Sequence, residues 1–113
     1  MSSLPVHDPA VGLRYVANNE ALYRKVLGKF ADQQAHAADE IAKAVQDGDQ
    51  ELAPRLAHTL KGLSASMGLP KLSETAVAVD MAFKEGQDVS PLLPGLDANL
   101  KEALEAIALY LGT

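Results

Sequence analysis

Histidine is the residue type with the widest chemical scope in this chain of 113 residues, because the sequence contains no cysteine. The lack of cysteine excludes disulfides, thiol catalysis and cysteine-ligated metal sites. The three histidines are His7, His36 and His58. An imidazole can act near neutral pH as a base, a metal ligand or a nucleophile. The surroundings of each histidine therefore decide which role it can take.

His58 lies in a helical segment, and its angular position indicates that it points to solvent. At about 100° per residue, the large apolar residues of segment 52–67 fall within one narrow arc. That arc consists of Leu52, Leu56, Leu60, Leu63 and Met67. With Leu56 at zero, His58 lies near about 200°. We expect the leucine arc to face the core and His58 to face away from it.

The neighbours of His58 suit an imidazole that carries a phosphoryl group. Lys61 stands three residues later and can place an ammonium beside an arriving anion. Gly62 stands one turn later, where a glycine costs a helix about 1 kcal/mol relative to alanine, and open access to the imidazole would offset that cost. Ala65 extends the same low surface. Helix geometry alone leaves the alternative open, in which His58 is an ordinary surface histidine beside a tolerated glycine.

The other two histidines have less support for a chemical role. His7 lies in segment 1–7, which has no strong pattern and is expected to be a loose tail without functional importance. His36 and Glu40 are four residues apart and could in principle chelate zinc. Zinc sites need three or more protein ligands, and no third ligand is apparent. We therefore expect a solvated face there and no metal site.

The composition and the spacing of apolar residues predict an all-α protein. The chain has 19 alanines and 17 leucines against 8 valines and 2 isoleucines, a balance that favours helices over strands. A short helix is expected from Asp8-Pro9 to about Val16. Four long helices are then expected over about 20–46, 52–67, 71–85 and from 90 onward. Short turns between them predict an antiparallel up-down four-helix bundle, with residues 8–113 as one domain after the tail.

The charge and the hydropathy of the chain exclude several classes of function. Ten basic residues against 15 acidic ones give a net charge of −5, which makes a nucleic acid an unsuitable partner. Aromatic residues make up only 4%, too few for a base-stacking surface. No apolar run approaches the 18 residues or so of a membrane span, and no signal peptide is visible. We expect a cytoplasmic protein that makes no membrane contact.

The run from Ala57 to Gly68, AHTLKGLSASMG, resembles the signature of histidine-containing phosphotransfer (HPt) domains. That signature is His-x-x-Lys-Gly with a further glycine ten residues after the histidine. Residues 12–13, residues 19–23 and the Gly48-Asp49 turn resemble the flanking pattern of the family in the same order. The resemblance implies a four-helix bundle with a short N-terminal helix. It also implies that His58 is phosphorylated, that Lys61 supports the phosphoryl charge and that Gly62 provides clearance.

Two positions depart from the family pattern. Leu63 follows the Lys-Gly pair, where many members have a small residue. Asp80 stands 22 residues after His58, where many members have Glu or Gln, and we expect it to orient the imidazole through the second ring nitrogen. Gln34 is expected to lie roughly level with His58 and to line the docking surface together with Ala65. An ordinary exposed glutamine is the alternative for Gln34, and a solvated lysine is the expectation for Lys84.

The resemblance implies a phosphorelay carrier, which accepts a phosphoryl group from a receiver-domain aspartate and passes it to another receiver. The partners are then receiver domains of response regulators or of hybrid histidine kinases. Thr59 stands where a histidine kinase usually has an acidic residue, and the sequence has no glycine-rich nucleotide loop. We therefore expect a monomeric carrier that binds no cofactor, with Mg²⁺ on the partner receiver.

Two other functions stay open on the sequence. The chain could be the phosphorylatable domain of a chemotaxis-type kinase, or a helical docking module without phosphoryl chemistry. The sequence also leaves open whether the chain is a whole protein or the C-terminal module of a hybrid sensor histidine kinase.

Overall fold

The computed structural model describes residues 3–112, and these residues form α-helices and one short 3-10 helix. The elements are α1 (Pro9–Arg14), α2 (Glu20–Gln34), α3 (Ala37–Gln46), α4 (Leu52–Ser66), α5 (Pro70–Lys84), η1 (Ser90–Leu92) and α6 (Leu93–Leu111). Residues 1–2 of the predicted tail and residue 113 of the predicted domain lie outside the described residues.

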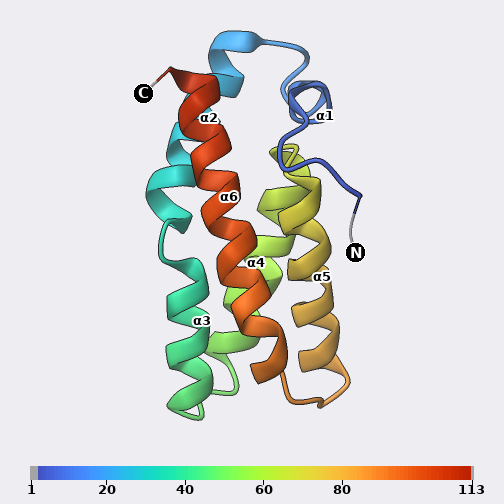
Figure 1. Ribbon diagram of the computed structural model, residues 1–113, viewed down its shortest axis with the longest axis vertical. Helices are drawn as coiled ribbons and strands as arrows, with labels where there is room; N and C mark the ends of the chain where they lie inside the picture. Colours follow the sequence, from blue (N-terminus) through green and yellow to red (C-terminus); the bar gives the residue numbers. More distant parts are fainter. Residues whose placement is uncertain (1–2, 113) are drawn as a thin grey trace.

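The helices form an antiparallel bundle, as the sequence predicts. Figure 1 shows α2 and α3 running down one side, α4 returning, α5 descending and α6 rising to the C-terminal end. The short helix α1 lies at one end of this bundle. The core between the helices is built largely from alanine and leucine side chains. The all-α four-helix bundle with a short N-terminal helix is therefore confirmed.

The predicted single helix over residues 20–46 is wrong, because α2 ends at Gln34 and α3 begins at Ala37. The buried side chains stay in register across the break. They are Tyr23, Leu27, Phe30, Ala37, Ala38, Ile41 and Ala44. Gln34 occupies the position of this stripe between Phe30 and Ala37, so the last turn of α2 has a partly exposed polar side chain where an apolar one would pack. The helical segment is interrupted next to this polar position, where it gains less from packing against the core.

Polar side chains and one glycine fix the turns at the helix ends. Asn19 Oδ1 accepts a hydrogen bond from the backbone N–H of Leu22 at 3.1 Å. Asp49 Oδ1 accepts from the backbone N–H of Leu52 at 2.9 Å. Gly68 adopts a left-handed φ of +75° after α4, and a side chain there would collide with the carbonyl oxygen of Asp8. The α4–α5 turn therefore packs directly against the chain that precedes α1.

The expectation of a loose N-terminal segment over residues 1–7 is wrong for residues 5–7. The backbone N–H of Lys71 donates to the carbonyl of Pro5 at 3.2 Å, and the N–H of Asp8 donates to the carbonyl of Gly68 at 2.8 Å. The segment is thus hydrogen-bonded to the chain around the start of α5.

His7 is likewise held in place by a contact with the core of the bundle. The Tyr23 hydroxyl is buried, donates to the carbonyl of Met67 at 2.6 Å and lies 2.8 Å from His7 Nε2. A buried tyrosine hydroxyl needs such partners, and this is the physical reason that His7 is held in place. Desolvation lowers the pKa of His7 below 6.5, against a smaller opposing effect of the Asp8 charge.

Candidate functional site

The helix that carries His58 packs on a different face from the one predicted. The buried residues of α4 are Ala53, Ala57, Leu60 and Ser64. Leu52 is exposed, and Leu56 and Leu63 are only partly buried. On the helical wheel, the centre of the buried arc therefore lies about 70° away from Leu56. The predicted core face is wrong by that angle.

Small side chains account for this rotation. α4 packs between α3 and α5, so two neighbouring helices approach it closely. Alanine and serine at the centre of the buried arc permit that approach, while the larger leucines fill the flanking grooves. His58 still lies about 130° from the centre of the arc. Its side chain is 64% exposed, so the prediction that it points to solvent is confirmed.

Asp80 on α5 is the hub of the polar contacts around His58. Its side chain is only 5% exposed. Asp80 Oδ1 lies 3.3 Å from His58 Nδ1, and Oδ2 accepts from Lys61 Nζ at 2.9 Å. Lys84 Nζ lies 3.0 Å from the same Oδ2 atom. The structure therefore brings together His58, Lys61 and Asp80, which the sequence singled out, and it adds Lys84 as an ion-pair partner.

The electrostatics of Asp80 determine which ring nitrogen of His58 is available. Desolvation by itself raises the pKa of Asp80, but hydrogen bonds and charge from Lys61 and Lys84 outweigh it and lower the pKa to about 2. Asp80 is therefore ionised at neutral pH and can only accept hydrogen bonds. In a neutral imidazole the proton then lies on His58 Nδ1, and Nε2 carries the free lone pair.

A groove of about 350 Å³ opens beside His58 between α4 and α5. Its lining residues are Pro54, Arg55, His58, Thr59, Asp80, Phe83 and Lys84. Arg55 and Phe83 were not among the predicted site residues. A signal for Arg55 was present, because a residue three positions before His58 lies on the same side of the helix.

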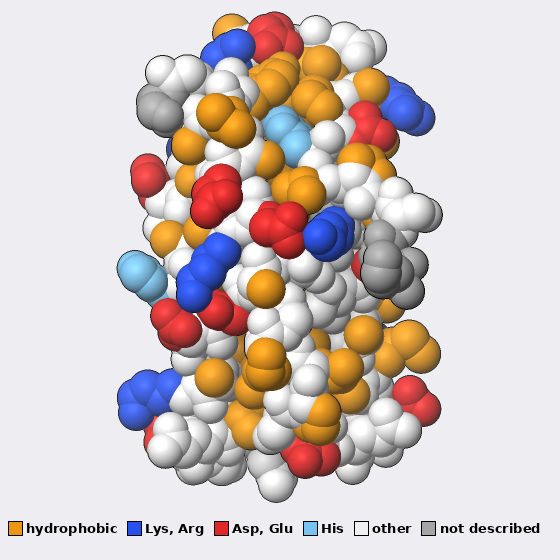
Figure 2. Space-filling model, in the orientation of Figure 1, with side chains coloured by type: hydrophobic (Ala, Val, Ile, Leu, Met, Phe, Trp, Pro, Cys, Tyr) orange, Lys and Arg blue, Asp and Glu red, His pale blue; other side chains and the backbone are white. Residues whose placement is uncertain are grey.

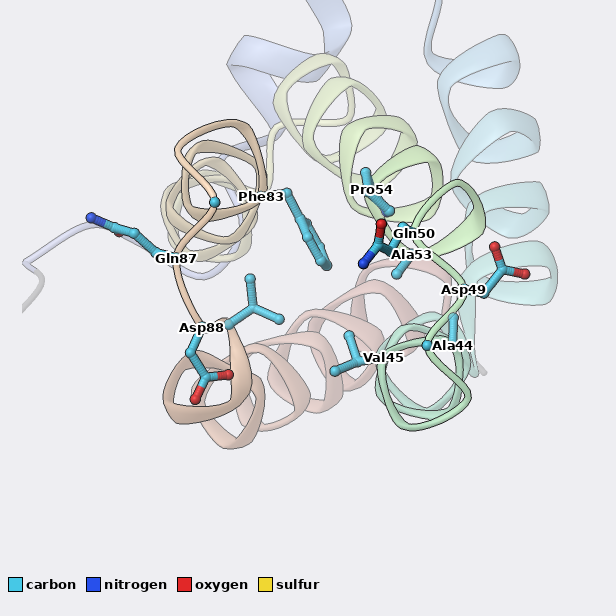
Figure 3. A pocket seen from close by; sticks show the side chains of 12 residues that line it. Ala44, Val45, Asp49, Gln50, Ala53, Pro54, Phe83, Gln87 and Asp88 are labelled. Atoms are coloured by element: carbon cyan, nitrogen blue, oxygen red, sulfur yellow. The ribbon is translucent and has the colours of Figure 1, made fainter.

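A second cavity, of about 470 Å³, adjoins this groove at the end of the bundle. The two spaces share Pro54 and Phe83 as lining residues. Figure 3 shows the Phe83 ring pointing into the cavity, whereas the side chains of Asp49, Gln87 and Asp88 point away from it. The His58 groove thus lies beside a second hollow, and Pro54 and Phe83 line both spaces.

Gly62 stands on the exposed surface of α4, one turn after His58. A Cβ atom added at Gly62 would meet no atom within 4 Å, so the packing of this chain does not require a glycine there. Ala65 is exposed and borders a different cavity, of about 450 Å³. Gln34 is partly exposed at the end of α2 and is not among the residues that line the His58 groove. The docking roles of these residues stay predictions.

Other functional groups are few in the part of the chain that the structure describes. Within residues 3–112 no group of three or more His, Asp or Glu side chains could hold a metal ion. His36 is exposed at the start of α3. None of the helices in this range combines the length and apolar character that a membrane crossing requires.

Comparisons with known proteins agree with the helical bundle described above. The family model described as "Hpt domain" matches residues 25–109, so the chain belongs to the Hpt family. It is a phosphotransfer carrier of two-component signalling and not a kinase, and receiver domains are its class of partner.

The fold has a solved counterpart in the crystal structure of the HPT domain from the Hpt sensor hybrid histidine kinase of Shewanella. The TM-score is 0.84, with 20% sequence identity over 95% of this chain and 94% of that chain. At this identity the likeness shows the fold alone. A search of curated proteins gave no match.

Proposed function

We propose that this protein accepts a phosphoryl group on His58 Nε2 from a receiver-domain aspartyl phosphate and passes it to an aspartate of another receiver. One observation carries the assignment to this residue: His58 is 64% exposed, and its Nδ1 atom is held by a buried, ionised Asp80. The nucleophilic nitrogen is thereby directed away from the protein and toward a partner.

The proposed phosphoryl transfer needs no reactant other than His58 and the aspartyl phosphate of the receiver. The Nε2 lone pair attacks phosphorus, the P–O bond of the aspartyl phosphate breaks, and the receiver carboxylate leaves with the bonding electron pair. The new N–P bond places positive charge on the imidazole ring. The carboxylate of Asp80 beside Nδ1–H stabilises that charge, as the aspartate of a Ser-His-Asp triad does for its histidine. The reverse step delivers the group to a second receiver.

Lys61 and Gly62 have distinct supporting roles in this proposal. The Lys61 ammonium is partly buried beside Asp80, one turn from His58, where it can screen the negative charge of a phosphoryl group. Gly62 leaves the surface open so that the receiver approaches the imidazole closely. Phosphoryl transfer depends mainly on positioning and electrostatic stabilisation, so these two contributions suffice on the carrier side.

The rest of the catalytic apparatus belongs to the partner in this proposal. Mg²⁺ is expected on the receiver domain, and the carrier binds no cofactor of its own. The carrier also has no ATP site, which agrees with Thr59 after the histidine and with the lack of a glycine-rich nucleotide loop in the sequence. We further propose that the chain acts as a monomer in the cytoplasm, either by itself or as the C-terminal module of a hybrid sensor kinase.

A labelling experiment tests the assignment of His58. The protein is incubated with a receiver domain that carries a radiolabelled aspartyl phosphate and with Mg²⁺. The wild type should become labelled, and His58→Gln should not. His36→Gln is the matched control, because it removes another exposed histidine, and it should be labelled like the wild type. Labelling of His58→Gln would disprove the assignment. Labelling by a kinase with ATP but by no receiver would favour a chemotaxis-type phosphorylatable domain.

A further inference from the structure

The cations around His58 are not equally available to a partner. Asp80 Oδ2 is bound by both Lys61 and Lys84, at 2.9 and 3.0 Å. One buried carboxylate thus holds both lysines of the site. Either lysine must weaken this ion pair before it can bind a new anion fully.

Arg55 lines the same groove but, unlike Lys61 and Lys84, is not held by a carboxylate of the described residues. It is exposed, stands three residues before His58 and forms no ion pair with any residue in the range 3–112. Other exposed cations of this protein pair along their own helix, as Arg24 does with Glu20 and Lys101 with Asp97.

Arg55 lacks such a pair although Glu51 stands four residues before it, the spacing at which helical ion pairs form. Arg55 instead lines the groove beside His58. Its charge is therefore available to a partner without breaking a contact of this protein.

We infer that Arg55 binds the anionic phosphorylation site of the receiver domain in the transfer complex, an inference that rests on the proposed function. A guanidinium presents several N–H donors in a planar fork that matches a carboxylate or a phosphoryl group in a bidentate manner. The receiver's phosphorylation site, with its aspartyl phosphate, supplies such anionic groups. Arg55 is a positioning and recognition residue here, since His58 performs the nucleophilic attack.

This role fits the charge distribution of the protein. The chain as a whole carries −5, so its average surface repels an acidic partner. An unpaired cation beside His58 makes this groove a favourable point of approach. A charge that attracts a partner raises the association rate and makes that rate depend on salt.

The test measures kcat/KM for transfer from a phosphorylated receiver over a range of salt concentrations. Arg55→Ala should lower kcat/KM on the order of tenfold, mostly through KM, as expected for the loss of a charged contact at an interface. It should also weaken the salt dependence. Arg55→Lys should rescue the activity only in part, because lysine cannot form the bidentate contact. Arg55→Glu should be the most impaired variant.

Lys25→Ala is the matched control, since Lys25 is an exposed cation on α2 that does not line the His58 groove. It should keep the KM and the salt dependence of the wild type. The lifetime of isolated phosphohistidine should be unchanged in Arg55→Ala, because Arg55 acts on the partner.

An Arg55→Ala variant with wild-type KM and salt dependence would overturn the inference, while labelling of the wild type would leave the proposed function standing. A loss confined to kcat would overturn it as well. Failure of phosphorylated receivers to label the wild type would overturn both the proposed function and this inference.

Discussion

Asp80 shows how a single buried carboxylate can organise a site that is otherwise exposed. A buried charge is costly unless it is paired, and Asp80 is paired with Lys61, Lys84 and the imidazole of His58. Because the ion pairs hold Asp80 as an anion, a neutral imidazole at His58 carries its proton on Nδ1, beside Asp80, and leaves Nε2 free. At the scale of residues, the orientation of the exposed His58 imidazole is thus controlled from the protein interior.

Gly62 provides a direct test of the clearance role at this scale. Gly62→Ala should raise the free energy of unfolding by up to about 1 kcal/mol, because alanine favours the helix and its methyl group meets no neighbour. The same variant should lower kcat/KM for phosphoryl transfer, since in the proposed complex the methyl group lies where the receiver approaches. Urea unfolding and receiver transfer assays measure the two effects.

Gly28 is the matched control for Gly62. It lies within α2, and an added Cβ atom there also meets no atom within 4 Å. Gly28→Ala should therefore stabilise the protein by a similar amount and leave phosphoryl transfer unchanged. If Gly62→Ala also transfers at the wild-type rate, Gly62 has no clearance role.

At the scale of elements, the sequence predicted the helices better than the faces they bury. Periodicity located α4, α5 and α6 to within a few residues, because each has a regular apolar stripe. It failed for the face of α4, since large leucines outweigh small residues on a helical wheel. Close packing between two helices instead favours Ala53, Ala57 and Ser64 at the centre.

Long-range contacts explain the other failures. The break between α2 and α3 lies beside Gln34, a polar residue in an otherwise regular apolar stripe, and the spacing of the stripe alone does not reveal that the helix ends there. The position of His7 depends on Tyr23 and Met67, which are 16 and 60 residues away in the sequence. Asp80 could be assigned to His58 only through the family resemblance, because spacing along two different helices does not define a contact.

The link between His7 and α2 should make stability depend on pH. The pKa of His7 is lowered in the folded protein, so the unfolded chain binds more protons below about pH 6.5. The stabilisation that neutral His7 contributes to the folded protein is complete above that pH. It is lost as the pH falls toward the pKa of His7 in the folded state. The free energy of unfolding should therefore decrease on acidification, and His7→Gln should show a smaller decrease because glutamine does not titrate.

Urea unfolding of both proteins between about pH 8 and about pH 5 measures this difference. The comparison between variants cancels the titration of the other groups. Equal pH dependences of the wild type and His7→Gln would show that His7 does not couple to folding.

At the scale of the whole molecule, the distribution of apolar surface favours a monomer. Large exposed apolar side chains occur in several elements. They are Leu4, Tyr15, Leu22, Leu52, Val77, Met81 and Leu109. On the face that Figure 2 shows, a belt of charged side chains crosses the middle and separates the apolar side chains above it from those below. On this face, apolar side chains that are separated in this way do not form the continuous core of a stable dimer interface.

The size and the charge of the molecule support the same expectation. A stable interface buries roughly 800 Å² per partner, a considerable part of the 6465 Å² surface of this protein. Such an interface would compete with a receiver for the surface around His58, and the net charge of −5 opposes self-association.

Light scattering should therefore give a mass of 11.9 kDa from micromolar to millimolar protein, before and after phosphorylation. Leu109→Glu, which removes the most exposed of these side chains, should leave that mass unchanged. A larger mass for the wild type that falls to 11.9 kDa in Leu109→Glu would instead show a dimer formed through the exposed end of α6.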